Sequence, residues 1–230
     1  MSRRALILVE GQTEERIVKD LIAPILAEKQ LFITPTIVKT KVVQGGSDFK
    51  GGLTSYQNFR TDLQKLLRGS GGALVTTMID FYGLPDDFPG MHDLPQKTDN
   101  MLELHIAQAT HVEEAIALKF DSPQNFLPFV ALHELEAWLF SSDDVAPGFL
   151  QFDADCREQF ARICRDHDTP EKINTDILTA PSKRLLQIFP RYRKTLHGPA
   201  ILSRIGIPAI RAKCPHFDEW FTQLEKYAEG

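Results

Sequence analysis

The chain has 230 residues, of which 43% are hydrophobic and 25% are charged, and its formal net charge is −5. This balance predicts one folded domain of generous size, or a core with a smaller lobe, and excludes a disordered protein. No apolar run approaches the roughly 20 residues that a membrane-spanning helix needs. The three cysteines lack the CxxC spacing of a zinc site. We therefore expect a cytoplasmic protein with no membrane segment.

Up to about residue 150, segments typical of strands alternate with segments typical of helices. Strands are expected at residues 4–9, 34–43, 73–80 and 128–134. Helices are expected at residues 13–30, capped by Thr13 and kinked at Pro24, at 55–69, in two pieces over 98–120, and from Glu136 onward. Residues 44–52 and 83–97 read as loops. The alternation predicts an α/β fold whose largely parallel strands all end at the same edge of the sheet.

After residue 150 the strand pattern stops, and prolines separate several short helical segments. We therefore predict an α/β core over residues 1–150 and a helical lobe over residues 151–230 that packs on it. The lobe contains a basic segment, Thr179–Lys213, with eight Lys or Arg and no Asp or Glu. The rest of the chain, with 18 basic and 31 acidic side chains, carries −13. The segment is either a polyanion-binding surface or an ordinary solvated helical surface.

Three predicted strands end on an acidic residue. Glu10 follows the apolar run "LILV", Asp80 closes residues 73–80, and Glu134 closes residues 128–134. An acid that closes a buried strand has no packing role, whereas Mg²⁺ is held by carboxylates that stay at rigid strand ends. Glu136 lies two residues after Glu134, so the two share a face in a strand but not in a helix. Glu14 fits either this site or the first turn of a helix.

Further candidates lie next to these acids and in the basic segment. His133 precedes Glu134, but "HELEA" lacks the second histidine of a zinc-peptidase HExxH motif. His133 is therefore a metal ligand, a proton shuttle or a hydrogen-bonded structural residue. Lys183 and Arg184 follow Pro181 at a predicted helix start, where the helix dipole disfavours cations. They either contact a phosphate or are ordinary surface charges. The glycine-rich "GGSDFKGG" lacks the lysine of a P-loop.

The stretches "LVEGQTEE" and "MIDFYGLP" resemble the TOPRIM fold, in which a glutamate ends the first strand and an Asp-x-Asp pair ends a later one. With "LHELEAWLF", "APSKRL" and "CPHFDEW", most of the chain resembles a bacterial TOPRIM-like family catalogued as domain of unknown function 4276. That family is related to nucleases of the overcoming-lysogenization-defect type. The resemblance implies that Glu10 is the TOPRIM glutamate and Asp80 the first aspartate of the pair. Tyr82 stands where the second aspartate is expected, which puts two-metal catalysis in doubt.

Together these observations predict a nuclease that cleaves phosphodiesters with Mg²⁺ or Mn²⁺, acting on DNA or RNA. The predicted catalytic residues are Glu10, Asp80, Glu134 and Lys183, the predicted metal ligands are Glu10, Asp80, Glu134 and Glu136, and the accessory candidates are Glu14, Tyr82, His133 and Arg184. Kinship implies a setting in phage defence and an ATPase partner, and a homodimer stays open. The alternatives are a non-catalytic regulatory module that partners an ATPase, or a metal-dependent phosphotransfer enzyme acting on nucleotides.

Overall fold

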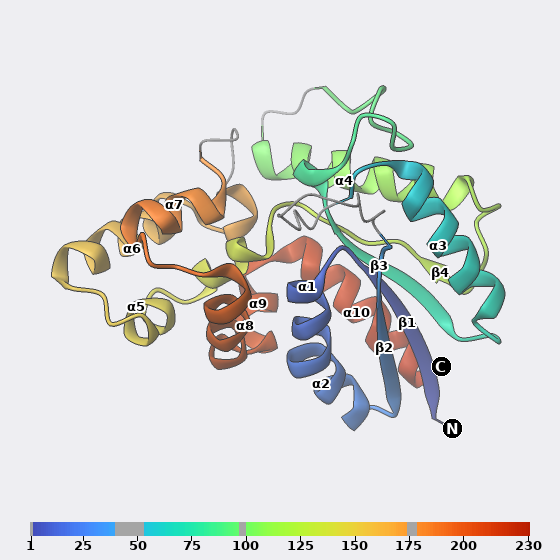
Figure 1. The fold of residues 1–230 in the computed structure, drawn as a ribbon, viewed down its shortest axis with the longest axis horizontal. Coiled ribbons are helices and arrows are strands. Elements are labelled where there is room, and N and C mark those ends of the chain that lie inside the picture. The colour runs from blue at the N-terminus through green and yellow to red at the C-terminus, as the bar shows by residue number, and fades with distance from the viewer. Residues whose placement is uncertain (1, 40–52, 97–99, 174–178) are drawn as a thin grey trace, which may run out of the picture.

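A parallel sheet forms the centre of the computed structural model, which describes residues 2–39, 53–96, 100–173 and 179–230. Its strands are β1 (Arg3–Val9), β2 (Leu31–Ile37), β3 (Leu74–Asp80), β4 (Phe126–Leu127) and β5 (Val130–Ala131). They lie in the order β2-β1-β3-β4, and β5 pairs with the last residues of β3. All the pairings are parallel, and helices flank the sheet (Figure 1). The predicted α/β class with a parallel sheet is therefore confirmed.

The two faces of the sheet bury separate apolar cores, because successive side chains of a strand point to opposite faces. Ile7, Val9 and Met78 pack on one face, under α1 (Gln12–Ile17), a π-helical turn (Val18–Ile22), α2 (Ala23–Glu28) and α10 (Pro215–Glu229). Leu8 and Ile79 pack on the other face, under α3 (Tyr56–Gly69) and α4 (Met101–Leu118). Both sides of β1 and β3 are therefore covered, as their near-continuous apolar sequences require.

The remaining helices gather on the side of the sheet away from α3 and α4 (Figure 1). They are α5 (Val145–Phe149), α6 (Ala154–Asp166), α7 (Pro181–Ile188), α8 (Lys194–Ile205) and α9 (Ile207–Lys213), with 3₁₀ turns at Leu135–Ser141 and Pro170–Lys172. Another 3₁₀ turn, Phe81–Gly83, follows β3, and its Phe81 packs in the core under α3 and α4. The core of the first face continues into them, so that Ile17, Leu202 and Phe217 belong to one cluster. The division at residue 150 stays a prediction, and apolar packing runs continuously across it.

Two expected elements are wrong in form. The helix expected in two pieces over residues 98–120 is the single helix α4, which has no proline or glycine and whose start is capped by the Asn100 side chain on the Leu102 amide at 3.0 Å. The strand expected at residues 128–134 is reduced to Val130–Ala131. Its partner β3 ends at Asp80, which pairs with Ala131, so within the described residues the pairing stops there. The chain then enters the 3₁₀ segment Leu135–Ser141, where a helix starting near Glu136 was expected.

The first helical region also departs from expectation at its start and near its middle. Gly11 is the N-cap residue of α1, whereas Thr13, the expected cap, lies buried inside the first turn. The π-helical turn ends just before Pro24, which has no amide hydrogen to continue the α-helical pattern. The strand expected at 34–43 begins earlier, at Leu31. Residues 40–43, the loop at 44–52, and residues 97–99 lie outside the described residues.

Trp220 of α10 fixes this C-terminal helix to the sheet through a buried hydrogen bond. Its indole Nε1 donates to the Thr76 hydroxyl of β3 at 2.9 Å, and Thr76 is fully buried. Its ring also stacks on Phe129, with 4.5 Å between ring centroids. Residues 144 positions apart in the chain are thereby joined at the centre of the molecule.

We expect Trp220→Phe to lower the free energy of unfolding by about 1–3 kcal/mol, because it leaves the buried Thr76 hydroxyl without its donor and removes packed ring atoms. Denaturant titration followed by circular dichroism measures this change. Tyr227→Phe on the same helix is the matched control, since its hydroxyl meets the Gly72 carbonyl at the surface and at 3.4 Å. Equal losses of unfolding free energy in the two variants would show that the Trp220–Thr76 hydrogen bond does not stabilise the fold more than a surface contact does.

Candidate functional site

The strand order reverses between β1 and β3, and the first two predicted acids lie at that point. The chain leaves β1 toward β2 on one side and returns as β3 on the other side. Ligands of open α/β sheets bind at the carboxyl ends of the strands at such a position. Glu10 directly follows β1 and Asp80 is the last residue of β3. The Asp80 backbone amide donates to Glu10 Oε1 at 2.8 Å, and the Glu10 charge acts on the Asp80 carboxyl group.

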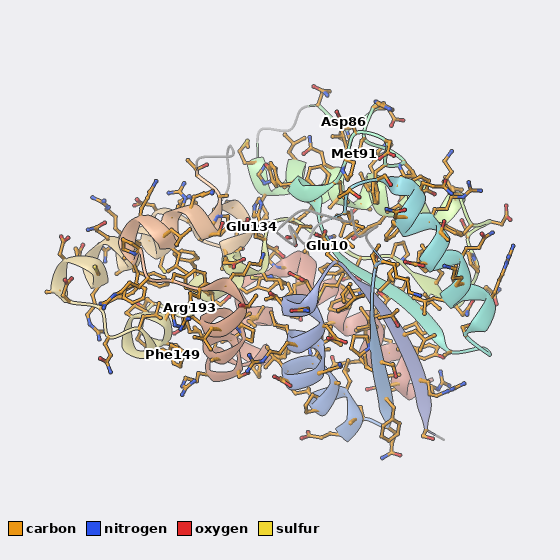
Figure 2. All side chains as sticks on the ribbon, viewed as in Figure 1. Glu10, Asp86, Met91, Glu134, Phe149 and Arg193 are labelled. Atoms are coloured by element: carbon orange, nitrogen blue, oxygen red, sulfur yellow. The ribbon has the colours of Figure 1, made fainter. Side chains whose placement is uncertain are left out.

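Lys194, the first residue of α8, extends its ammonium group into a group of acids around this pair. Its Nζ lies 3.2 Å from Glu136 Oε2 and 4.0 Å from Glu14 Oε1. Asp80 and Glu134 also act on its charge. We call these acids the carboxylate cluster: Glu10, Glu14, Asp80, Glu134 and Glu136. Figure 2 shows Glu10 and Glu134 in the central region where the sheet edge meets the 3₁₀ segment. Five of the predicted site residues therefore meet around a lysine that was not predicted.

Burial and crowding make the two strand-end carboxyl groups hold protons unusually well. Burial raises the pKa of Glu10 to about 7; the Asp80 amide opposes this rise, and the nearby Glu14 charge adds to it. Burial and the Glu10 charge raise the pKa of Asp80 well above its usual range. A cation that bound here would relieve this repulsion, since each carboxylate is destabilised chiefly while it is ionised.

Glu136 and Lys194 form the most enclosed pair of the site. Burial raises the pKa of Glu136, which is 2% exposed, and the Lys194 charge opposes that rise. Burial disfavours the Lys194 ammonium, but the attraction of Glu136, Asp80, Glu14 and Glu134 outweighs it and raises the pKa of the lysine. Tyr192 donates its hydroxyl to the other oxygen of Glu136 at 3.3 Å. Gly198 gives that hydroxyl room, because a Cβ there would lie 3.0 Å from it.

Glu134 caps a helix and does not end a strand. It lies three residues beyond β5, and its Oε2 accepts a hydrogen bond from the Ser182 amide of α7 at 3.1 Å. A carboxylate at this position is stabilised by the positive end of the helix dipole. Lys183 is exposed on the same turn of α7, and Arg184 donates to the Thr179 carbonyl at 2.8 Å. Glu134 thus ties the start of α7 to the cluster, with Lys183 beside it.

His133 and Tyr82 form an aromatic group next to the acids, together with His105 of α4. His133 is buried, and its Nε2 donates to the Glu171 carbonyl at 2.8 Å, because a carbonyl only accepts. Burial lowers the pKa of His133 to about 4, so the ring is neutral at pH 7. Tyr82 stacks on it at 5.3 Å and stays 45% exposed, and His105 meets it edge-on at 5.5 Å. His133 is therefore a hydrogen-bonded neutral base whose Nδ1 has no hydrogen-bond partner among the described residues.

The donor set fits Mg²⁺ or Mn²⁺ in type. Within residues 2–39, 53–96, 100–173 and 179–230, no group of three His, Cys, Asp or Glu side chains stands ready to hold a metal ion. Mg²⁺ is, however, commonly held by one or two carboxylates, with water and substrate phosphates supplying its other ligands. Glu10 and Asp80 are such a pair: both are partly exposed, and both have raised pKa values that a cation would lower.

Sequence reasoning missed Lys194, Tyr192 and His105. Lys194 was counted within the basic segment, but nothing in its spacing signals that it meets five acids from distant parts of the chain. The same holds for Tyr192 and for His105, whose apolar helical neighbours gave no indication of a polar site. Asp87, in the loop that follows β3, accepts the Tyr56 amide at the start of α3 at 3.1 Å.

Comparison with known proteins places the chain in one family. No curated protein and no solved structure matches it. No helix in the described part of the chain has the length and apolar character needed to cross a membrane. The model of a family described as a domain of unknown function, DUF4276, matches residues 9–225, from the end of β1 into the last helix. The matched region includes the whole carboxylate cluster, and the chain belongs to the DUF4276 family.

Proposed function

We propose that this protein is a nuclease of TOPRIM type that cleaves nucleic-acid phosphodiesters with Mg²⁺ or Mn²⁺. The observation that carries the proposal is the meeting of Glu10 and Asp80 at the strand-order reversal, joined by a 2.8 Å hydrogen bond. Both side chains come from rigid strand ends, and both have pKa values raised by burial and mutual repulsion. Strongly perturbed acids at a ligand-binding edge of a sheet are typical of catalytic sites.

Glu10 and Asp80 would hold the metal ion in this proposal. The bound ion would supply an activated water molecule and would stabilise the charge that develops on the scissile phosphate. Glu14 and Glu136 have a different role, since they are almost fully buried and hold the ammonium group of Lys194. Lys194 keeps its charge at this position and thereby limits the net negative charge that an approaching phosphate meets.

The aromatic group and the start of α7 supply the remaining parts. His133 is buried and neutral at pH 7, so we propose that it positions Tyr82 beside the acids and is not a charged ligand. Lys183 is exposed on the helix that Glu134 caps, which supports a contact from Lys183 to a substrate phosphate. Tyr82 occupies the place of the second TOPRIM aspartate, so we propose a site built on two acidic ligands.

We expect Glu10→Gln and Asp80→Asn each to abolish Mg²⁺ and Mn²⁺ binding in calorimetry, because each removes one of two charged ligands. Cleavage of single- and double-stranded DNA and RNA should fall at least about 100-fold in both variants. Glu15→Gln is the matched control, because Glu15 lies in the first turn of α1, shortly after Glu10, but pairs with Lys19 at the surface. Cleavage that survives in both site variants would show that another part of the chain carries the activity.

The stability of the metal-free protein should depend on the ionisation of Glu10. Its pKa is about 7 in the folded state against 4.5 for the free side chain, so the folded state binds the proton more tightly. The resulting stabilisation is fully present below pH 4.5 and is lost as the pH rises through 7. Buried His133, whose pKa is lowered, changes the pH dependence of stability in the opposite direction. The quantity to compare is therefore the difference in the free energy of unfolding between the wild type and Glu10→Gln.

Between pH 4.5 and 8 we expect the free energy of unfolding of the wild type to fall by about 1–3 kcal/mol relative to Glu10→Gln. Mg²⁺ should restore the free energy of unfolding of the wild type at pH 8 and change it little at pH 5, because the ion binds the ionised carboxylate. Denaturant titrations at both pH values, with and without Mg²⁺, measure these differences. Parallel pH profiles for the two proteins would contradict the assigned environment of Glu10.

A non-catalytic regulatory module that partners an ATPase is the second candidate. The observation that favours it is Lys194, whose ammonium already balances charge within the carboxylate cluster. Acids held by an internal lysine form a structural ion-pair group, which also perturbs pKa values without catalysis. The two candidates differ in whether a metal ion replaces the lysine charge when that charge is removed.

We expect Lys194→Met to lower the free energy of unfolding of the metal-free protein by about 1–3 kcal/mol, because Glu136 is left buried without its cation. In a metal-binding enzyme, Mg²⁺ should return most of this loss and bind more tightly than in the wild type. Lys183→Met is the control, since Lys183 is exposed and its loss should leave stability unchanged. A loss that Mg²⁺ does not repair, in a protein that binds no metal, would support the regulatory module.

A further inference from the structure

The segment Phe189–Lys194 separates the carboxylate cluster from a second site. Tyr192 and Lys194 contact Glu136 in the cluster. Arg191 and Arg193 instead line a cavity of about 610 Å³. Its walls are formed by Leu150, Gln151, Phe189, Pro190, Arg191, Tyr192, Arg193 and His197. Consecutive residues of one short segment therefore serve two neighbouring sites of opposite charge.

Two arginine–phenylalanine pairs contact His197: Phe189 and Arg191 line this cavity, whereas Phe149 and Arg204 lie outside its lining. The Arg191 guanidinium lies 5.3 Å from the centre of the Phe189 ring, and that of Arg204 lies 4.4 Å from the centre of the Phe149 ring. The His197 ring lies between the two phenylalanines, 6.3 Å and 6.4 Å from them. We call this the arginine–aromatic surface: Phe149, Phe189, Arg191, Arg193, His197 and Arg204. In Figure 2, Arg193 and Phe149 are labelled on the same side of the molecule, to the left of Glu10.

The cations of this surface are not neutralised by acids. No Asp or Glu lines the cavity, and the sequence has none from Thr179 to Lys213. Arg191 and Arg193 are both exposed, and among the described residues neither guanidinium has a hydrogen bond or ion pair. Arg211, in contrast, pairs with Asp218 and Glu225. The surface is therefore complementary to an anion that the folded chain does not itself supply.

We propose that the arginine–aromatic surface binds a single-stranded nucleic acid, with its phosphates on Arg191 and Arg193. Guanidinium groups are the preferred donors to phosphate, and those already laid on phenylalanine rings offer flat faces on which unpaired bases stack. A duplex hides its bases and offers only its phosphates, so the rings favour a single strand. An acidic protein would match the charge but would not use these flat faces.

The residues of this surface adjoin the carboxylate cluster in the chain. Tyr192 and Lys194 alternate with the two arginines and reach the buried Glu136, so the segment that carries the arginines also holds the cluster. This inference rests on the proposed function for its purpose, because it names the form of the substrate that the nuclease would take. The binding itself requires no metal ion, since arginine and ring contacts supply it.

The test is binding of a fluorescent 12-nucleotide oligo-dT to the full chain in EDTA, followed by fluorescence anisotropy over a range of salt concentrations. We expect Arg191→Glu/Arg193→Glu to weaken binding at least tenfold. The salt slope should fall by about 1.4, because each lost phosphate contact removes about 0.7. Arg60→Glu/Arg68→Glu is the matched control, with the same charge change on exposed residues of α3. This control should bind within about twofold of the wild type if the site is local.

Three outcomes would overturn the proposal: equal losses in the two double variants, a duplex of the same sequence that binds at least as tightly as the single strand, or a poly-glutamate peptide that competes as well as the oligonucleotide. Cleavage assays with Mg²⁺ keep the two proposals apart. If Glu10→Gln abolishes cleavage while Arg191→Glu/Arg193→Glu leaves binding unchanged, the nuclease proposal is supported and the binding surface is wrong. If Arg191→Glu/Arg193→Glu abolishes binding while the Glu10→Gln variant still cleaves, the binding surface is supported and the assigned metal site is wrong.

Discussion

The repulsion among five carboxyl groups is the constraint on which the arrangement of this protein depends. Glu10 and Asp80 come together because β1 and β3 are neighbours in the sheet, and Glu14 follows within one helical turn. Burying such a group without a cation would cost several kcal/mol for each ionised side chain. Lys194 supplies one positive charge from α8, and burial raises the pKa of Glu10, Asp80 and Glu136. The site is thus held together by partial neutralisation.

The placement of Lys194 depends in turn on how the C-terminal helices attach to the sheet. Glu171 accepts the amides of His216 and Phe217 at 3.0 Å and 3.1 Å and so satisfies the start of α10. Its backbone carbonyl accepts the hydrogen bond from His133 beside the acids. Glu113 of α4 likewise joins the Val130 amide to the His216 ring. These buried polar contacts join α4, β5 and α10, and so connect the helices of the two faces, which bury separate apolar cores.

The close spacing of opposite charges along residues 191–194 gives the molecule two functional sides. Toward the sheet edge, Tyr192 and Lys194 satisfy buried acids. Toward solvent, Arg191 and Arg193 face a cavity without acids. A net charge of −5 conceals this division, because the acids of the cluster are partly or fully buried while Arg191 and Arg193 are exposed. An anionic chain would therefore meet a local field different from the one that the whole-molecule charge suggests.

The sequence by itself determined the class of the fold and the two acids of the strand ends. Apolar runs closed by Glu10 and Asp80 are local patterns, and the rule that parallel strands end at one edge places them together. Only the tertiary structure decided that Glu134 caps α7, that Glu136 is buried on Lys194, and that His133 is a neutral ring under Tyr82. Each of these depends on contacts between residues tens of positions apart. Helical and strand periodicity report which face of an element is apolar, but not which distant side chain will meet it.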